Sequence, residues 1–284
     1  KLKHTLIMKI ISFFNKILTV LLLAGATLML LFIVFSGSVD NFPFNKFFWV
    51  EADVSSLSVP GGDYARWTFW GICYPDELDS ASTSNCPNLG PDVPISPYDN
   101  FGNSANLPQD FVDNSSTYYY LSRFSFPFLL IALIFSGVSL ISSIMAPCWL
   151  AMQKVIVFFV GLGCLFCTTG ACLITSVAVL TRNHFRDADM ASKIGATSLG
   201  LVWASTACLM IVFLTSCCSA TRKVYNKEQQ QFQHNVSTQA PVQYPPTGLP
   251  QNDELNQFPQ QESSGIRFFK IRRNQEKADG DSVV

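Results

Sequence analysis

The feature that most constrains this chain is a set of four long apolar runs that contain no Asp, Glu, Lys or Arg. These runs span residues 17–39, 124–153, 155–181 and 194–221. A hydrocarbon layer of roughly 30 Å is crossed by about 20 apolar residues in a helix. A backbone in hydrocarbon must satisfy its own hydrogen bonds, so each run is predicted to be a membrane-spanning helix. The predicted fold class is a membrane all-α bundle of four transmembrane helices.

Positive charge near the ends of the chain orients this bundle. Basic residues gather on the cytoplasmic side of membrane proteins. The first 16 residues hold four lysines and no acid, and Arg222, Lys223 and Lys227 open the tail. The segment from Ser36 to Arg123 instead holds 11 acidic and 3 basic residues. We therefore expect both termini to be cytoplasmic and the acidic loop to be extracellular, although the basic residues of the short loop 181–193 oppose this orientation.

The runs and their charges together divide the chain into nine segments. The expected segments are a cytoplasmic N-terminus (1–16), transmembrane helix 1 (17–35), an extracellular domain (36–122), transmembrane helix 2 (124–146), a cytoplasmic loop (147–154), transmembrane helix 3 (155–180), an extracellular loop (181–193), transmembrane helix 4 (194–216) and a disordered cytoplasmic tail (217–284). The first run is longer than the roughly 7–15 apolar residues of a signal peptide, so we expect a retained anchor. The sequence begins with Lys1, and Met8 is a candidate start.

The first loop is long enough to fold by itself. It has 87 residues, with aromatic clusters and turn signals such as Pro60-Gly61-Gly62. Loops of this length are usually folded or functional, and closely spaced turns favour short strands. Cys73 and Cys86 are its only cysteines. Two thiols in an oxidising space are expected to pair, so we predict a small, β-rich, disulfide-bonded extracellular domain.

The other cysteines lie in or near the spans or at the cytoplasmic edge. Five are expected to be packing residues: Cys148, Cys164, Cys167, Cys172 and Cys208. Cys217 and Cys218 end the fourth run, where juxtamembrane cysteines are candidates for S-palmitoylation; ordinary thiols at the membrane edge are the alternative. Asn114 begins an Asn-X-Ser sequon on the predicted outer side and is the glycosylation candidate.

Small residues recur every four positions in the third and fourth runs. They are Gly163, Cys167, Ala171 and Thr175 in the third, and Ala196, Gly200, Ala204 and Cys208 in the fourth. Small side chains at this spacing let helix backbones approach closely. Packing within the bundle is the favoured interpretation, and a lateral surface for self-association is the other.

The tail after Thr221 is rich in Gln, Asn and Pro and has too few apolar residues for a core. It contains one basic and aromatic island, in which the lipid-contact candidates are Arg267, Phe268, Phe269, Lys270, Arg272 and Arg273. Such a segment suits an anionic inner leaflet. The alternatives are contact with a protein partner and a solvated linker.

One outer-loop motif combines large aromatic residues with a tight turn and a cysteine. Arg66, Trp67, Trp70 and Gly71 precede Cys73. The two tryptophans can cover a small core that lacks enough apolar area of its own, and Gly71 permits close approach. Arg123 stands where the second span meets the outer surface and is expected to tie the acidic loop to the helix end. The expected role of these residues is structural.

This motif resembles the signature of claudin-like four-span proteins. Two longer stretches, 45–53 and 96–104, together with Tyr118-Tyr119-Tyr120-Leu121-Ser122-Arg123, resemble the fungal SUR/PalI family of eisosome-associated plasma-membrane proteins. The resemblance covers roughly residues 10–220. It implies residence in cortical membrane patches, with roles in cell-wall integrity, endocytosis or sporulation. For PalI-type members it implies ambient-pH sensing.

The sequence offers no catalytic constellation. It has three histidines, none in a metal-ligand spacing, and no phosphate loop or nucleophile elbow. No apolar run carries the intramembrane charge that transporters and proton relays normally need. We therefore expect no enzyme activity, no cofactor, no metal and no nucleic-acid partner. The expected partners are membrane lipids, copies of this chain or related four-span proteins, and cytosolic eisosome coat proteins. The expected function is membrane organisation, with a pH-sensor subunit as the alternative.

Overall fold

The computed structural model describes residues 2–39, 42–57, 59, 61–78, 80, 86–87, 89–102, 106–146 and 152–238. Its compact unit runs from Lys1 to Val236. The predicted lipid-contact island and Cys148 lie outside the described residues.

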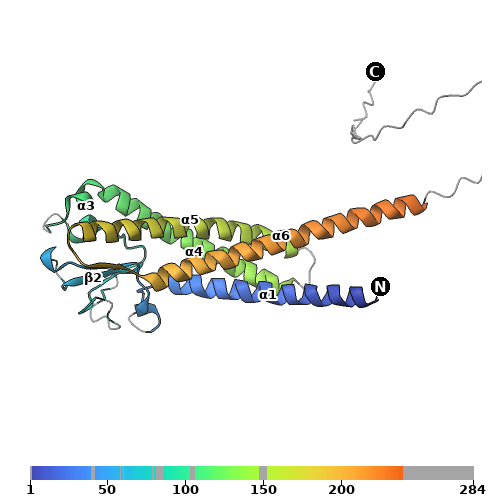
Figure 1. Cartoon of the computed structure of the whole chain (residues 1–284), viewed down its shortest axis with the longest axis horizontal. Coiled ribbons are helices and arrows are strands. Elements are labelled where there is room, and N and C mark those ends of the chain that lie inside the picture. Colours follow the sequence, from blue (N-terminus) through green and yellow to red (C-terminus); the bar gives the residue numbers. More distant parts are fainter. Residues whose placement is uncertain are drawn as a thin grey trace, which may run out of the picture. The chain divides into compact units, whose positions relative to one another are not determined.

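Four long helices dominate the described chain (Figure 1). They are α1 (Leu2–Val34), α4 (Ser115–Met145), α5 (Met152–Asp187) and α6 (Ala196–Thr238). Within the described residues, these four are long and apolar enough to cross a membrane. The predicted four-helix fold is confirmed.

All four of these helices extend past the predicted membrane boundaries. Helix α1 begins at Leu2, fifteen residues before the predicted start at 17. Helix α4 begins nine residues before the predicted start at 124, so Pro127 lies inside the helix and not in its first turn. Helix α5 continues to Asp187, seven residues past the predicted end. Helix α6 continues to Thr238, so the prediction of disorder from residue 217 is wrong for its first part. Apolarity marks only the part of a helix that lies in hydrocarbon, whereas the backbone bonds of a helix continue in water or against a domain.

A four-stranded antiparallel sheet lies at one end of the bundle (Figure 1). Its strands are β1 (Val50–Asp53), β2 (Tyr64–Trp67), β3 (Ile72–Cys73) and β4 (Ser192–Ile194), in the order β3-β2-β1-β4. The prediction of a β-rich domain is therefore confirmed. However, β4 comes from the second loop and pairs with β1, so the domain is not built from the first loop alone.

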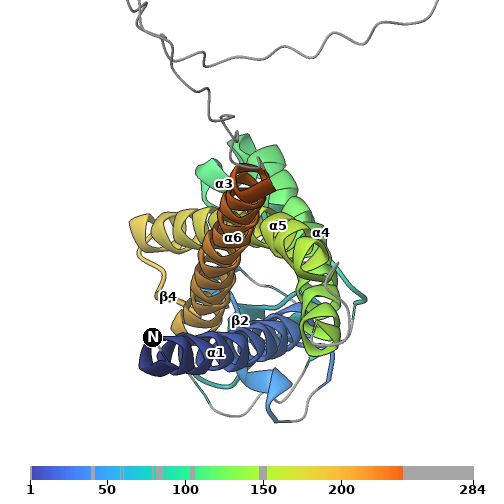
Figure 2. The same ribbon diagram turned by 90° about the vertical axis from the view of Figure 1, so that its right-hand side faces the viewer.

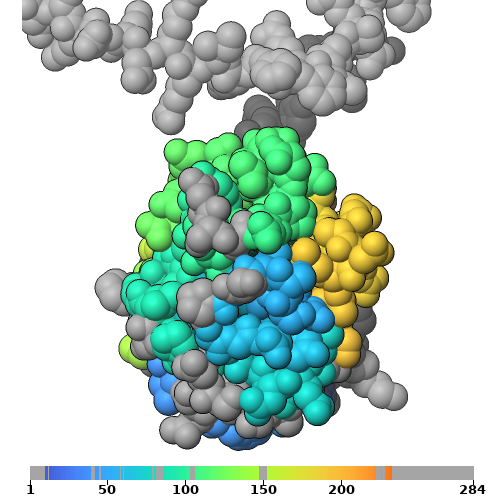
Figure 3. Space-filling model, turned by 90° about the vertical axis from the view of Figure 1, so that its left-hand side faces the viewer, coloured from blue at the N-terminus to red at the C-terminus, as the bar shows by residue number. Residues whose placement is uncertain are grey.

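Short helical turns connect the sheet to the long helices. They are η1 (Phe44–Lys46), η2 (Ser55–Leu57), α2 (Pro97–Phe101) and α3 (Gln109–Asp113). Figure 3 looks onto the sheet end of the molecule, where the first-loop strands, in blue, lie beside the end of α5 and β4, in yellow.

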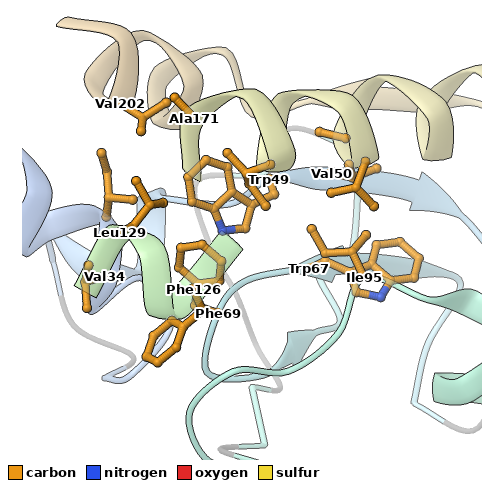
Figure 4. Close-up of a cluster of buried hydrophobic side chains, with 14 of the residues drawn as sticks. Val34, Trp49, Val50, Trp67, Phe69, Ile95, Phe126, Leu129, Ala171 and Val202 are labelled. Atoms are coloured by element: carbon orange, nitrogen blue, oxygen red, sulfur yellow. The ribbon is translucent and has the colours of Figure 1, made fainter. Parts of the chain in front are cut away.

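One hydrophobic core joins the sheet to the bundle. Trp49 is fully buried, and in Figure 4 its ring projects toward Ala171 of α5 and Val202 of α6. The ring of Phe69 lies 4.8 Å from that of Trp49 and 5.3 Å from that of Phe126 on α4 (centroid distances). Burying a side chain of this size contributes roughly 2–3 kcal/mol, so the sheet is anchored by the same residues that close the end of the bundle.

Helices α4 and α5 run side by side at close range (Figure 2). A Cβ added at Gly170 of α5 would lie 2.8 Å from Cγ of Leu129 on α4, closer than side chains pack. Gly163, Cys167 and Ala171 of α5 are buried. The small-residue stripe of α5 therefore packs inside the bundle, as the favoured interpretation predicted.

The matching stripe of α6 faces outward. Ala196, Gly200 and Ala204 are exposed, Cys208 is partly exposed, and a Cβ at Gly200 would meet no atom within 4 Å. The favoured prediction of packing within the bundle is wrong for this stripe. The inward face of α6 instead carries larger residues, Val202, Leu209 and Val212, which are fully buried. Small hydroxyl residues, Ser198 and Ser205, are buried beside them on this inward face.

Candidate functional site

The predicted disulfide between Cys73 and Cys86 is present in the structure. Cys73 ends β3, the edge strand of the sheet, and is itself buried. The bond ties this two-residue strand to the segment that leads back toward the bundle. In the chain-entropy model, closing a loop of this size contributes roughly 3 kcal/mol. A strand of two residues has few ladder hydrogen bonds of its own. The disulfide therefore contributes a large share of the stability of this edge strand.

The predicted turn motif fixes the domain to the end of α1. The Thr68 hydroxyl donates to the Gly71 carbonyl at 2.7 Å and accepts from the Gly71 N–H at 3.1 Å. This turn presents Trp70, whose indole N–H donates to the carbonyl of Val34, the last residue of α1, at 2.8 Å. The Trp70 ring also stacks on Phe35 at 5.9 Å. Trp70 therefore both satisfies an end carbonyl of the helix and holds the turn against it.

Trp67 is the last residue of β2, just before this turn, and is fully buried. Its indole N–H donates to Asn100 Oδ1 at 2.8 Å, and its ring lies 5.9 Å from that of Phe185 on α5. The same Asn100 oxygen accepts from the Ser96 N–H at 3.3 Å, at the start of α2. Trp67 thus connects β2 to both α2 and α5.

Arg66 forms a buried ion pair inside the sheet. Its guanidinium donates to Glu51 Oε1 at 3.0 Å, and the two side chains are 2% and 0% exposed. Glu51 and Arg66 are register partners on β1 and β2, so the ladder holds them opposite each other. The guanidinium also lies 4.5 Å from the ring centroid of Phe48 and donates to the Ser80 carbonyl at 3.0 Å. A buried charge pair is costly to desolvate but strongly specifies its register, because losing either partner leaves an uncompensated charge.

Arg123 ties the loop before α2 to α4, as predicted. Its guanidinium donates to the Asp92 carbonyl at 2.9 Å and lies 3.5 Å from the Asp92 carboxylate. Burial raises the pKa of Asp92 to about 6, and the nearby Arg123 charge opposes that rise. Asp92 has a positive φ of 65°, a conformation that Asp adopts more readily than most residues.

The remaining predicted residues lie apart from this domain core. Asn114 is exposed at the junction of α3 and α4, and its glycosylation stays a prediction. Cys217 is partly exposed and Cys218 is exposed on α6. They lie on a continuing helix and not at its end, and their palmitoylation also stays a prediction. Among the described residues, no three His, Cys, Asp or Glu side chains are grouped closely enough to hold a metal ion.

The sequence reasoning missed the partners of the motif residues. Glu51, Asn100 and Asp92 each contact a predicted residue but were not singled out. Glu51 had a visible signal, since it is a charged residue placed between the apolar residues Val50 and Ala52 of β1. Asn100 lies in α2, 33 residues from Trp67, and Asp92 lies in a loop, 31 residues from Arg123, so only the tertiary fold brings these pairs close.

The chain matches a known protein family over most of its length. Residues 15–215 match the model of the SUR7/PalI family. The protein named Protein SUR7 from Candida albicans is 43% identical over 286 residues, covering 97% of this chain and 100% of the relative. The protein of the same name from Saccharomyces cerevisiae is 36% identical over 199 residues, covering 70% and 65% of the two chains. A third relative, a Saccharomyces cerevisiae protein named as a plasma membrane protein, is 28% identical over 273 residues, covering 90% and 86%.

Proposed function

Because the chain belongs to the SUR7/PalI family, we propose that it is a non-enzymatic organiser of plasma-membrane domains at the cell cortex. The patches in question are those associated with eisosomes, and the dependent processes are cell-wall integrity, endocytosis or sporulation. Both termini face the cytoplasm, and the disulfide-bonded domain faces the cell wall. A relative named as a plasma membrane protein supports this location. The disulfide supports an oxidising environment for the domain.

The observation that carries the proposal is the outward stripe on α6. Ala196, Gly200 and Ala204 leave a shallow, exposed strip on a membrane-spanning helix. Helices associate in lipid through close packing of small residues, because lipid gives no hydrophobic force between them. Exposed Trp203 and Met210 lie on the same helix. They provide larger groups that a facing helix packs around.

The partners of this surface are copies of the chain or related four-span proteins. Lateral assembly concentrates many copies of the outer domain in one patch. Membrane lipids surround the assembly, and cytosolic eisosome coat proteins contact its cytoplasmic side.

Gly200→Leu tests the proposal. The leucine has room within the monomer, since no atom lies within 4 Å of the added Cβ, so the fold is expected to survive. It would separate two helices that meet at the stripe, and we expect smaller assemblies in mild detergent and fewer cortical patches by fluorescence imaging. Gly137→Leu is the matched control, because Gly137 on α4 is equally open and lies outside the stripe. Assemblies and patches that are unchanged in Gly200→Leu would mean that the stripe faces lipid.

A second candidate function is supported by Asp92. A carboxyl group with a pKa of about 6 changes its charge within the range of ambient pH, and this one contacts Arg123 at the outer part of α4. In that case the chain is a PalI-type sensor subunit whose outer domain responds to pH and whose tail recruits an effector. A sensor would redistribute or be modified when external pH changes, whereas an organiser would stay in stable patches. Imaging the tagged protein at two external pH values distinguishes them.

A further inference from the structure

A cavity lined by four cationic residues lies at the sheet end of the bundle. It has a volume of about 350 Å³ and lies between η1, the end of α5, strand β4 and the first turn of α6. Its cationic residues are Lys46, Arg182, Arg186 and Lys193. Among the described residues that line it, none is acidic. This concentration of positive charge contrasts with the acidic composition of the first loop.

The two arginines are held in place by neutral acceptors. Arg182 donates to Asn183 Oδ1 at 2.8 and 3.2 Å, and Arg186 donates to the Ser192 carbonyl at 3.2 and 3.3 Å. Bonds to neutral groups orient a guanidinium without cancelling its charge. Lys193 lies opposite Glu51 in the sheet register, and Glu51 is also bonded to Arg66. The arginines and Lys46 therefore supply most of the positive field in the cavity.

The wall of this cavity is built from close backbone contacts. Gly195 donates its N–H to the Trp49 carbonyl at 2.9 Å, and a Cβ at Gly195 would overlap the carbonyl oxygen of Phe48. Phe48 itself lines the cavity and is half-buried. The β1–β4 pairing fixes this wall, so the cavity does not depend on a flexible surface loop.

The cavity lies at the level where lipid headgroups are expected. Arg182 is near the end of the membrane-spanning helix α5, and Ala196 begins the span of α6. The first turn of α6 adds the partial positive charge of a helix N-terminus to the four side chains.

From this geometry we propose that the cavity binds a phosphate-bearing anion through the guanidinium groups of Arg182 and Arg186, with Lys46 and Lys193 as supporting charges. Guanidinium groups match phosphate oxygens with paired, charge-assisted hydrogen bonds. The ligand is either the headgroup of an anionic lipid or free phosphate, since both present the same oxygens. Its position at the headgroup level favours the lipid. This inference does not depend on lateral assembly.

The test uses the full chain purified in an uncharged detergent. Three probes are titrated separately: dioctanoyl phosphatidylinositol, inorganic phosphate and dioctanoyl phosphatidylcholine. We expect phosphatidylinositol to bind and to bind more weakly as salt rises. The double variant Arg182→Gln/Arg186→Gln is expected to weaken that binding at least about tenfold, since charge-assisted bonds are lost. The matched control, Lys16→Gln/Lys154→Gln, removes two exposed charges elsewhere on α1 and α5 and should bind as the unmodified chain does.

Each outcome decides the proposal. Binding of phosphatidylinositol alone supports a lipid site, and binding of inorganic phosphate as well supports a general phosphate site. Equal binding of phosphatidylcholine and phosphatidylinositol, or undiminished binding by the double variant, would overturn the proposal. If the double variant does not fold, Arg186→Gln alone serves, because Arg186 is exposed and its loss leaves the packing intact.

Discussion

The buried pair of Arg66 and Glu51 makes a sharp prediction about what holds the outer domain together. Replacing Glu51 by Gln keeps the shape of the side chain and removes its charge. Arg66 would then keep an uncompensated charge at a position that is 2% exposed. Removing one partner of a buried pair typically costs about 3–5 kcal/mol. This cost is as large as the roughly 3 kcal/mol expected from the disulfide. Glu51→Gln should therefore destabilise the outer domain about as much as loss of the disulfide would.

Hydrogen exchange read by mass spectrometry measures this cost where it occurs. Amides of β1 and β2 exchange when the sheet opens, and a loss of about 3 kcal/mol accelerates exchange at least 100-fold. Amides in the middle of α5 are the internal reference, because they report on the membrane bundle. We expect faster exchange in the sheet peptides of Glu51→Gln and little change in the α5 peptides.

Two further variants separate the charge effect from other causes. Asp63→Asn removes an exposed carboxylate just before β2 and should leave exchange unchanged. Replacing the pair together, as Glu51→Leu/Arg66→Met, removes both buried charges and should restore most of the protection lost in the single variant. Sheet exchange in Glu51→Gln that matches the unmodified chain would refute the reasoning. So would a double variant that exchanges as fast as the single one.

Three other predictions concern pH, modification and the tail. Asp92 has a pKa of about 6 in the folded chain, against 3.8 when unperturbed. Between these two values the folded chain binds a proton that the unfolded chain does not bind. The free energy of unfolding should therefore fall as pH rises from 4 to 6. Asp92→Asn should lose that part of the pH dependence, which thermal unfolding at both pH values would reveal; an identical pH profile in the variant would contradict it. A second sequon, Asn235-Val236-Ser237, lies on the predicted cytoplasmic side, so only Asn114 is expected to carry glycan. Glycan found on Asn235 by peptide mapping would overturn the predicted topology. A peptide of residues 262–277 is expected to co-sediment with anionic vesicles, and to do so less at high salt. The double variant Phe268→Ala/Phe269→Ala should bind these vesicles more weakly while keeping the salt dependence. Equal binding of the peptide to neutral and anionic vesicles would contradict the electrostatic part of the prediction.

The architecture could be predicted because the lengths of the apolar runs and the two cysteines of the first loop indicate it directly. Each apolar run was long enough to require a membrane helix, and two cysteines in one loop had only each other as partners. The strand Ser192–Ile194 left no such signal, since three residues are too few to show an alternating pattern. It forms only because β1 offers a free edge 139 or more residues earlier in the chain. The cationic cavity depends on that pairing, so it could not be predicted either.

The two small-residue stripes show most clearly that residue spacing alone does not predict which way a helix face points. Both repeat every four residues, yet Gly163 of α5 is buried against α4 while Gly200 of α6 meets nothing. In a water-soluble protein the outward face of a helix would be polar, and the sequence would tell the two apart. In a membrane the outward face is apolar too, because lipid is as apolar as the protein interior. Spacing therefore identifies a surface fit for close packing, and only the positions of the other helices decide whether the same chain covers it.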